Sequence, residues 1–205
     1  MSTGYQIYDK HGAYFLTFQI VDWVDIFSRK VYRDIIVEAL NYCTEYKHLQ
    51  VSAWVIMTNH IHIILRSDKN NISDIVRDFK AHTARQILKH VTADANESRK
   101  QWMQHVFSFN ASQHKRNEKL QLWTHENHAI YLDPLNPELY QTRINYIHQN
   151  PVRAGWVLEA EHYLYSSAID FAGGKGMVKL EVWKYFDSCK LSSYYDVGTA
   201  YAELG

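Results

Sequence analysis

The stretch 59–65, NHIHIIL, constrains the fold of this chain more than any other part of its sequence. Its residues alternate with the two-residue period of a β-strand, in which side chains two positions apart point the same way. His60 and His62 therefore share one face, while Ile61, Ile63 and Leu65 share the other. Two imidazoles held side by side on a strand are able to bind one divalent metal. A structural pair of histidines is the alternative until a third ligand is found.

Strands and helices alternate along most of the chain. Period-two patterns and apolar runs predict strands over 14–21, 51–57, 60–65 and 128–132. Apolar stripes predict helices over 28–47, from 71 onward, and from Asn136, an expected cap, to Pro151. The order β, α, β, β, α, β predicts an α+β fold of ferredoxin-like type, with an antiparallel sheet and helices on one face. A further helix follows near the C-terminal part of this unit.

The chain length suits one main domain. Its 205 residues suffice for one good core with appended elements. We expect this domain to span 1–175, followed by a tail of unassigned role over 176–205. Within the domain, 99–120 mixes basic residues with Trp102 and Phe107 but lacks a helical period. We interpret 99–120 as a flexible insertion.

Charge and targeting signals narrow the classes of partner. Basic and acidic residues number 22 each, so there is no overall attraction to nucleic acid or membranes, and any basic surface must be local. Neither a signal-peptide pattern nor an apolar run of membrane-spanning length is found, and the two cysteines are far apart, which fits a reducing compartment. We therefore expect a cytoplasmic protein without a membrane partner.

The last predicted helix supplies the remaining candidates. Tyr146 and Asn150 are four residues apart, so they share one helical face. If this face meets His60 and His62, the Asn150 oxygen completes a three-ligand site, and such a mixed set suits Mg²⁺ or Mn²⁺ acting on phosphate. The Tyr146 phenol would then attack a phosphodiester and form a covalent phosphotyrosine. An ordinary core tyrosine is the alternative.

Two motifs in this chain resemble those of a known family. His60-Ile61-His62 resembles the histidine, hydrophobe, histidine signature of the HUH nucleases. The segment 146–155, YIHQNPVRAG, closely resembles the tyrosine segment of the REP-associated tyrosine transposases, relatives of the single-tyrosine insertion-sequence transposases. The likeness covers most of 14–174. Thr58 stands where many relatives have proline, and 99–120 looks longer than usual.

The resemblance implies a ferredoxin-like HUH domain that nicks and rejoins single-stranded DNA at hairpin or repeat elements. It implies that Tyr146 is the catalytic nucleophile, which forms a 5′-phosphotyrosine and leaves a free 3′-hydroxyl. It also implies that His60, His62 and Asn150 hold the metal, Mg²⁺ or Mn²⁺. The expected partner is single-stranded or hairpin DNA. Relatives include dimers that exchange the tyrosine helix, so a homodimer is an open alternative to a monomer.

DNA recognition needs local contacts because the net charge is zero. Exposed cations would bind phosphates and a tryptophan would stack on a base. The candidates for these contacts are Arg77, Lys80, Arg85, Trp123 and Arg153. Ordinary surface cations and a core tryptophan are the alternative for each. Two rival functions also stay open: a hairpin-binding protein that performs no chemistry, and a metal-dependent phosphoesterase that uses water.

Overall fold

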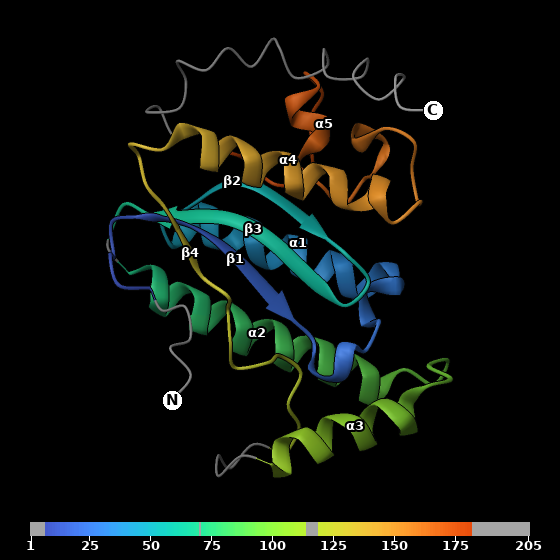
Figure 1. The fold of residues 1–205 in the computed structure, drawn as a ribbon. Coiled ribbons are helices and arrows are strands. Elements are labelled where there is room, and N and C mark those ends of the chain that lie inside the picture. Colours follow the sequence, from blue (N-terminus) through green and yellow to red (C-terminus); the bar gives the residue numbers. More distant parts are fainter. Residues whose placement is uncertain (1–6, 70, 114–118, 182–205) are drawn as a thin grey trace, which may run out of the picture.

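The computed structural model describes residues 7–69, 71–113 and 119–181. Its strands are β1 (Ala13–Gln19), β2 (Leu49–Ile56), β3 (His60–Ser67) and β4 (Ile130–Leu132). They form one sheet in the order β2-β3-β1-β4, with every neighbouring pair antiparallel. Helix α1 (Lys30–Tyr46) connects β1 to β2, and helix α2 (Ile72–Ala93) follows β3 (Figure 1). The predicted α+β fold of ferredoxin-like type is confirmed.

Helices cover both faces of this sheet, so the expectation of helices on one face is wrong. Helices α1 and α2 lie on one face, and α4 (Pro137–Arg153) lies on the other (Figure 1). The core beneath α1 and α2 contains Phe18 and Ile63, whereas the core beneath α4 contains Phe15, Ile64 and Ile147. Because side chains alternate along β3, its histidines share the α4 face with Ile64. The sheet therefore brings the two imidazoles to the helix that carries Tyr146.

The remaining helices are short or peripheral. They are the 3-10 turns Val21–Trp23, Ile26–Ser28 and Ala160–His162, and the α-helices α3 (Lys100–Ser112) and α5 (Ala168–Phe171). Within the described ranges, no helix combines the length and apolar character that crossing a membrane requires.

The expectation of a flexible insertion over 99–120 is wrong for most of that segment. Helix α3 buries Met103, Phe107 and Ala111, which recur every fourth residue. This stripe is narrow, and the exposed aromatic rings of Trp102, just before it, and Phe109, within it, hide the period. Residues 114–118 lie outside the described part of the chain.

The two ends of α4 differ in how well the sequence predicted them. Asn136 caps the helix as expected, because its Oδ1 accepts from the backbone N–H of Leu139 at 3.1 Å. Pro151 does not end the helix as expected, because α4 continues through it to Arg153. The helix ends instead near Gly155, whose φ of +73° is the left-handed conformation that glycine adopts without strain.

The predicted tail reaches the outer edge of β2 at Glu181. The backbone N–H of Glu181 donates to the carbonyl of Val51, and the Ser52 hydroxyl donates to the carbonyl of Glu181. The rest of the tail, 182–205, lies outside the described residues, and the domain boundary at 175 stays a prediction.

A buried carboxylate joins the start of α1 to the segment after α2. Glu97 Oε2 accepts from the Arg29 guanidinium at 2.5 Å and from the Tyr32 hydroxyl at 3.1 Å, and its side chain is 3% exposed. Burial alone would raise the pKa of Glu97, but the hydrogen bonds from Arg29, the Arg99 backbone and Tyr32 outweigh it and lower this pKa. The carboxylate is therefore ionised in the folded protein.

Replacing Glu97 with glutamine is expected to lower the free energy of unfolding at pH 7 by about 1 to 3 kcal/mol. Because the pKa of Glu97 is lower in the folded state, the unfolded state takes up its proton first. The stabilisation that ionised Glu97 contributes is complete above the ordinary carboxyl pKa. It is lost as the pH falls through the lower pKa of Glu97 in the folded state. Urea unfolding at pH 7 and pH 3 measures the free energy of unfolding of wild type and E97Q. If the difference between the two proteins does not shrink at pH 3, the role of ionised Glu97 is contradicted. Asp74→Asn, which removes an exposed pair with Arg77, should change stability much less than E97Q does.

Candidate metal and tyrosine site

The two histidines lie at the start of β3, on the face that α4 covers. In the β1–β3 pairing, His62 lies opposite Thr17 and His60 opposite Gln19. The centroids of the two imidazole rings are 4.6 Å apart. His62 is buried, with 6% of its surface exposed, whereas His60 is partly exposed at the end of the strand. The pair therefore reaches from the protein interior to solvent.

Hydrogen bonds fix the orientation of His60. The side-chain amide nitrogen of Asn59 donates to the carbonyl of Trp23 at 3.3 Å. The side-chain oxygen of Asn59 therefore faces His60, where it lies 2.7 Å from Nδ1. Because this oxygen only accepts, Nδ1 of His60 carries the proton and Nε2 keeps a free lone pair. Nδ1 of His62 is likewise engaged, 2.9 Å from the Thr17 hydroxyl.

These contacts fit a metal site. A histidine that binds a metal commonly holds an oxygen partner with its other ring nitrogen. Among the described residues no three His, Cys, Asp or Glu side chains gather at one point, so a third protein ligand has to come from a residue of another type. An amide oxygen is such a donor, and it suits a hard divalent cation better than a soft one.

The aromatic ring of Tyr146 lies beside His62 in the same chain. The two ring centroids are 5.1 Å apart, and Phe15 packs against both, at 5.9 Å from Tyr146 and 5.3 Å from His62. Asn150 is on the next turn of α4, where its amide nitrogen donates to the carbonyl of Tyr146 at 2.6 Å. The structure thus joins His60, His62 and Tyr146 directly through ring contacts and places Asn150 on the adjoining turn.

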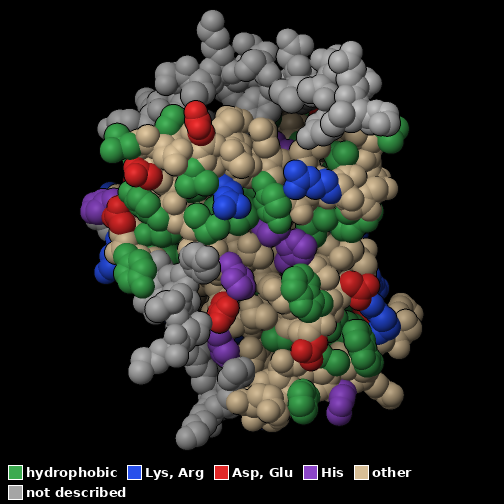
Figure 2. Space-filling view, in the orientation of Figure 1, with side chains coloured by type: hydrophobic (Ala, Val, Ile, Leu, Met, Phe, Trp, Pro, Cys, Tyr) green, Lys and Arg blue, Asp and Glu red, His purple; other side chains and the backbone are tan. Residues whose placement is uncertain are grey.

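The surroundings of this site favour an anion. Burial lowers the pKa of His62 to about 3, helped by His60 and the Arg143 guanidinium, and burial also lowers the pKa of His60. The guanidinium of Arg143 lies 5.2 Å from the Phe15 ring, and its buried Nε has no hydrogen-bond partner. Arg153 is exposed, and its guanidinium lies 5.7 Å from the Tyr146 ring. Figure 2 shows histidines near the middle of this view with basic side chains above them.

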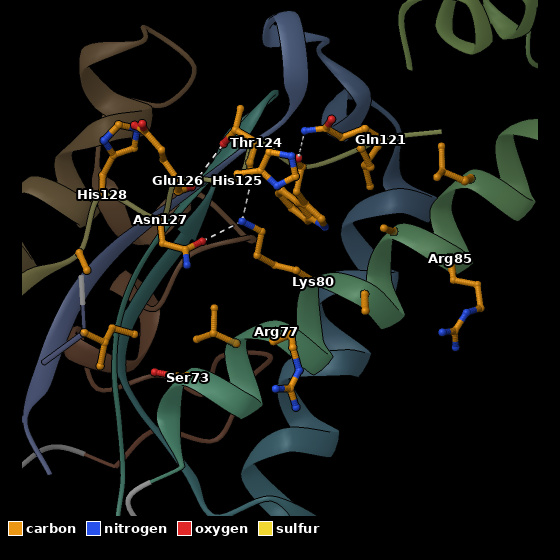
Figure 3. Close-up of a pocket in the computed structure, with 18 of the residues that line it drawn as sticks. Ser73, Arg77, Lys80, Arg85, Gln121, Thr124, His125, Glu126, Asn127 and His128 are labelled. Carbon is orange, nitrogen blue, oxygen red and sulfur yellow. Dashed lines mark hydrogen bonds and ion pairs between the residues drawn. The ribbon is translucent and has the colours of Figure 1, made fainter. Parts of the chain in front are cut away.

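The predicted DNA contacts divide between two places. Arg153 adjoins Tyr146, whereas Arg77, Lys80, Arg85 and Trp123 all line a groove of about 840 Å³ between α2 and 120–129 (Figure 3). None of the predicted ligands lines this groove. Sequence reasoning could not separate the two groups, because their separation depends on how α2 and α4 are placed on opposite faces of the sheet.

Two of the candidate DNA contacts in the groove have side chains that are not exposed. The Lys80 ammonium donates to the carbonyl of Thr124 at 2.8 Å and to Asn127 Oδ1 at 2.7 Å (Figure 3), and burial lowers its pKa to about 8. Trp123 is 5% exposed and its indole N–H donates to the Thr83 hydroxyl at 3.1 Å. Lys80 therefore ties 124–127 to α2, and Trp123 belongs to the core rather than to a stacking surface.

The two cations that stay exposed in the groove differ from each other. Arg77 pairs with Asp74 at 2.7 Å and with Asp78 at 3.2 Å. Arg85 is exposed on the same helix (Figure 3). Of the two, Arg77 is already partly neutralised by carboxylates.

Four residues of the candidate site were not predicted as functional. Thr17 and Asn59 orient the imidazoles, the Trp23 carbonyl orients Asn59, and Arg143 adds positive charge. Strand alternation places Thr17 on one face of β1, but only the pairing register sets it opposite His62. His148, within the tyrosine segment, faces away from the site, with Nε2 at 2.9 Å from the Ser167 hydroxyl.

Comparisons with known proteins agree with this geometry. Residues 16–126 match the family model described as "Transposase IS200 like". A solved structure entitled "Structure of the REP associates tyrosine transposase bound to a REP hairpin" is similar with a TM-score of 0.54 and 18% sequence identity, over 88% of this chain and 92% of that one. No curated protein matches. These findings confirm the resemblance that the two motifs indicated, and the structural similarity confirms the fold.

Proposed function

The chain belongs to the family of IS200-like transposases, which are DNA-processing enzymes, and on this premise we propose that it nicks and rejoins single-stranded DNA with Tyr146 as nucleophile. The observation that carries the proposal is the 5.1 Å separation of the Tyr146 and His62 rings within one chain. A phenol next to a pair of oriented imidazoles and two guanidinium groups is suited to attack an anionic phosphodiester. This arrangement also supports a monomer in which each chain uses its own tyrosine.

The reaction proceeds by transesterification. The Tyr146 oxygen bonds to phosphorus as its proton departs, the bond from phosphorus to the 3′ oxygen breaks, and that oxygen takes up a proton. The products are a 5′-phosphotyrosine and a free 3′-hydroxyl. Attack by a 3′-hydroxyl on the phosphotyrosine reverses the step and rejoins a strand. Arg153, beside Tyr146, and Arg143 offset charge on the non-bridging oxygens.

His60 and His62 through Nε2, together with the Asn150 oxygen, are the residues that would hold Mg²⁺ or Mn²⁺. When bound, such a cation polarises a phosphate oxygen and offsets charge in the transition state. The pairing of each Nδ1 with an oxygen supports this assignment. Thr17 and Asn59 then act as positioning residues, because they set the ring orientation of the two histidines.

The proposed substrate is single-stranded DNA that carries a hairpin or repeat. The similar solved structure is described as bound to a REP hairpin. In this chain, Arg153 is suited to contact phosphates next to the scissile bond, while Arg77 and Arg85 are suited to contact phosphates along the α2 groove. Lys80 would act indirectly, through the loop it holds.

Removing divalent metal is expected to lower covalent adduct formation by more than about 100-fold, because two imidazoles alone supply no charge to offset that of the phosphate. In the test, the full chain is incubated with labelled single-stranded DNA that contains a hairpin flanked by randomised sequence. Mn²⁺ or EDTA is added, and adducts are detected on a denaturing gel. Adding excess Mn²⁺ or Mg²⁺ after EDTA should restore the adduct. An adduct that forms equally well in EDTA would contradict the metal assignment.

The two rival functions give other results in this assay. A hairpin-binding protein without chemistry binds the strands but yields no adduct with any metal. A phosphoesterase that uses water cuts the strands with Mn²⁺ but leaves no DNA on the protein. Only the proposed function joins the 5′ phosphate of the cut strand to Tyr146.

A further inference from the structure

Trp23 is an exposed aromatic residue at the edge of the histidine pair. Its side chain is 59% exposed, and the centroid of its indole lies 6.1 Å from that of the His60 imidazole, with the two rings nearly perpendicular at 80°. Aromatic side chains contribute to stability mainly through the large apolar area that they bury. An indole left in solvent at this position therefore does little for the fold.

The backbone at this residue adopts an unfavourable conformation. Asp22 and Trp23 have φ values of +49° and +55°, in the left-handed region that costs about 1 to 2 kcal/mol for a residue other than glycine. Neighbouring elements hold it there: Asn59 donates to the Trp23 carbonyl, and Asn110 of α3 donates to the Asp22 carboxylate at 2.7 Å. The hydrogen bond from Asn59 to the Trp23 carbonyl helps to orient His60. Because this bond uses only the backbone of residue 23, it does not explain why the side chain is an indole.

We infer that the Trp23 indole is a stacking site for an unpaired nucleobase of single-stranded DNA, next to the phosphate held at His60 and His62. The inference rests on the proposed function, since it takes the phosphate position from it. Stacking of a base on an aromatic side chain contributes about 1 to 3 kcal/mol and accepts any base. The indole is largely exposed and lies beside the His60 ring, so a base stacked on it would sit next to the proposed phosphate position.

Other exposed aromatic residues do not share this placement. Trp102 of α3 is 49% exposed, but its ring lies 5.9 Å from the Arg99 guanidinium. Tyr42 and Tyr46 contact each other at the end of α1, with tilted rings whose centroids are 5.0 Å apart. Of these rings, the Trp23 indole is the one in contact with an imidazole of the site. Trp102 is therefore a matched control: an exposed tryptophan that contacts neither histidine.

The test measures binding of fluorescein-labelled dT15 to the full chain in Mn²⁺ by anisotropy. Trp23→Ala should weaken binding by about 5- to 100-fold, Trp23→Phe by less than about threefold, and Trp102→Ala by less than about twofold. A 15-mer backbone of abasic residues should bind wild type and Trp23→Ala equally. Base binding should also quench the intrinsic tryptophan fluorescence of the wild type, but much less that of Trp23→Phe. This comparison reports on the indole ring without requiring the alanine variant to fold.

The inference is overturned if Trp23→Ala weakens dT15 and the abasic strand equally, if it weakens neither, or if the wild type does not bind dT15. These results are separate from the adduct assay. A Tyr146-linked adduct without a Trp23 effect on dT15 leaves the proposed function standing and removes the stacking site. If Trp23→Ala weakens dT15 but not the abasic strand, and no adduct forms, the stacking site stands and the proposed chemistry is wrong.

Discussion

Replacing Tyr146 with phenylalanine is expected to abolish the covalent DNA adduct, with a loss of at least about a thousandfold. The change removes one oxygen and keeps the ring that packs against Phe15 and His62, so the local structure should be preserved. Binding of single-stranded DNA and of Mn²⁺ should therefore change by less than about threefold. Adduct formation on denaturing gels and Mn²⁺ titration measure the two effects separately.

The control for Tyr146→Phe is Tyr42→Phe, which removes a hydroxyl from an exposed tyrosine of α1. Its adduct yield should equal that of the wild type. If an adduct persists in Tyr146→Phe, another side chain is the nucleophile. If Tyr146→Phe still cuts the strand but without an adduct, water is the nucleophile, and the role proposed for Tyr146 is wrong.

Local periodicity explains how much of this site the sequence could predict. Strand alternation puts His60 and His62 on one face, and helical spacing puts Tyr146 and Asn150 on another. The order of the elements then predicts the ferredoxin-like sheet, while the meeting of the last helix with the histidine face stays a condition at that stage. Each of these steps depends on residues that are near each other in the chain.

The features that the sequence could not predict depend on contacts between distant residues. The hydrogen bond between Thr17 and His62 joins residues 45 positions apart, and those from Lys80 to 124–127 join residues 44 and 47 apart. A helical stripe places Lys80 beside solvent, but it cannot show that a later loop closes over the ammonium group. The positive φ of Trp23 leaves no sequence signal either, because glycine or asparagine is the usual sign of that conformation.

Replacing His62 with alanine is expected to lower Mn²⁺ affinity by at least about 100-fold and to abolish the adduct. His62 is the buried member of the pair, and its ring also supports Phe15 and Tyr146, so the change removes a ligand and loosens the nucleophile. Isothermal titration with Mn²⁺ measures the first effect, and the gel assay measures the second. His82→Ala, which removes an exposed histidine of α2, should affect neither.

Thr17→Val separates binding of the metal from support of Tyr146. Valine keeps the shape of threonine but cannot hydrogen-bond Nδ1 of His62, so Mn²⁺ affinity should fall by about 10- to 100-fold while the ring contacts of His62 persist. If His62 only packs against Tyr146, Thr17→Val leaves Mn²⁺ affinity unchanged, and His62→Ala lowers adduct yield without altering Mn²⁺ binding. That outcome would contradict the ligand role of His62. Together with intact Mn²⁺ binding in Tyr146→Phe, a loss of Mn²⁺ affinity in both variants would establish that ligand and nucleophile are distinct residues.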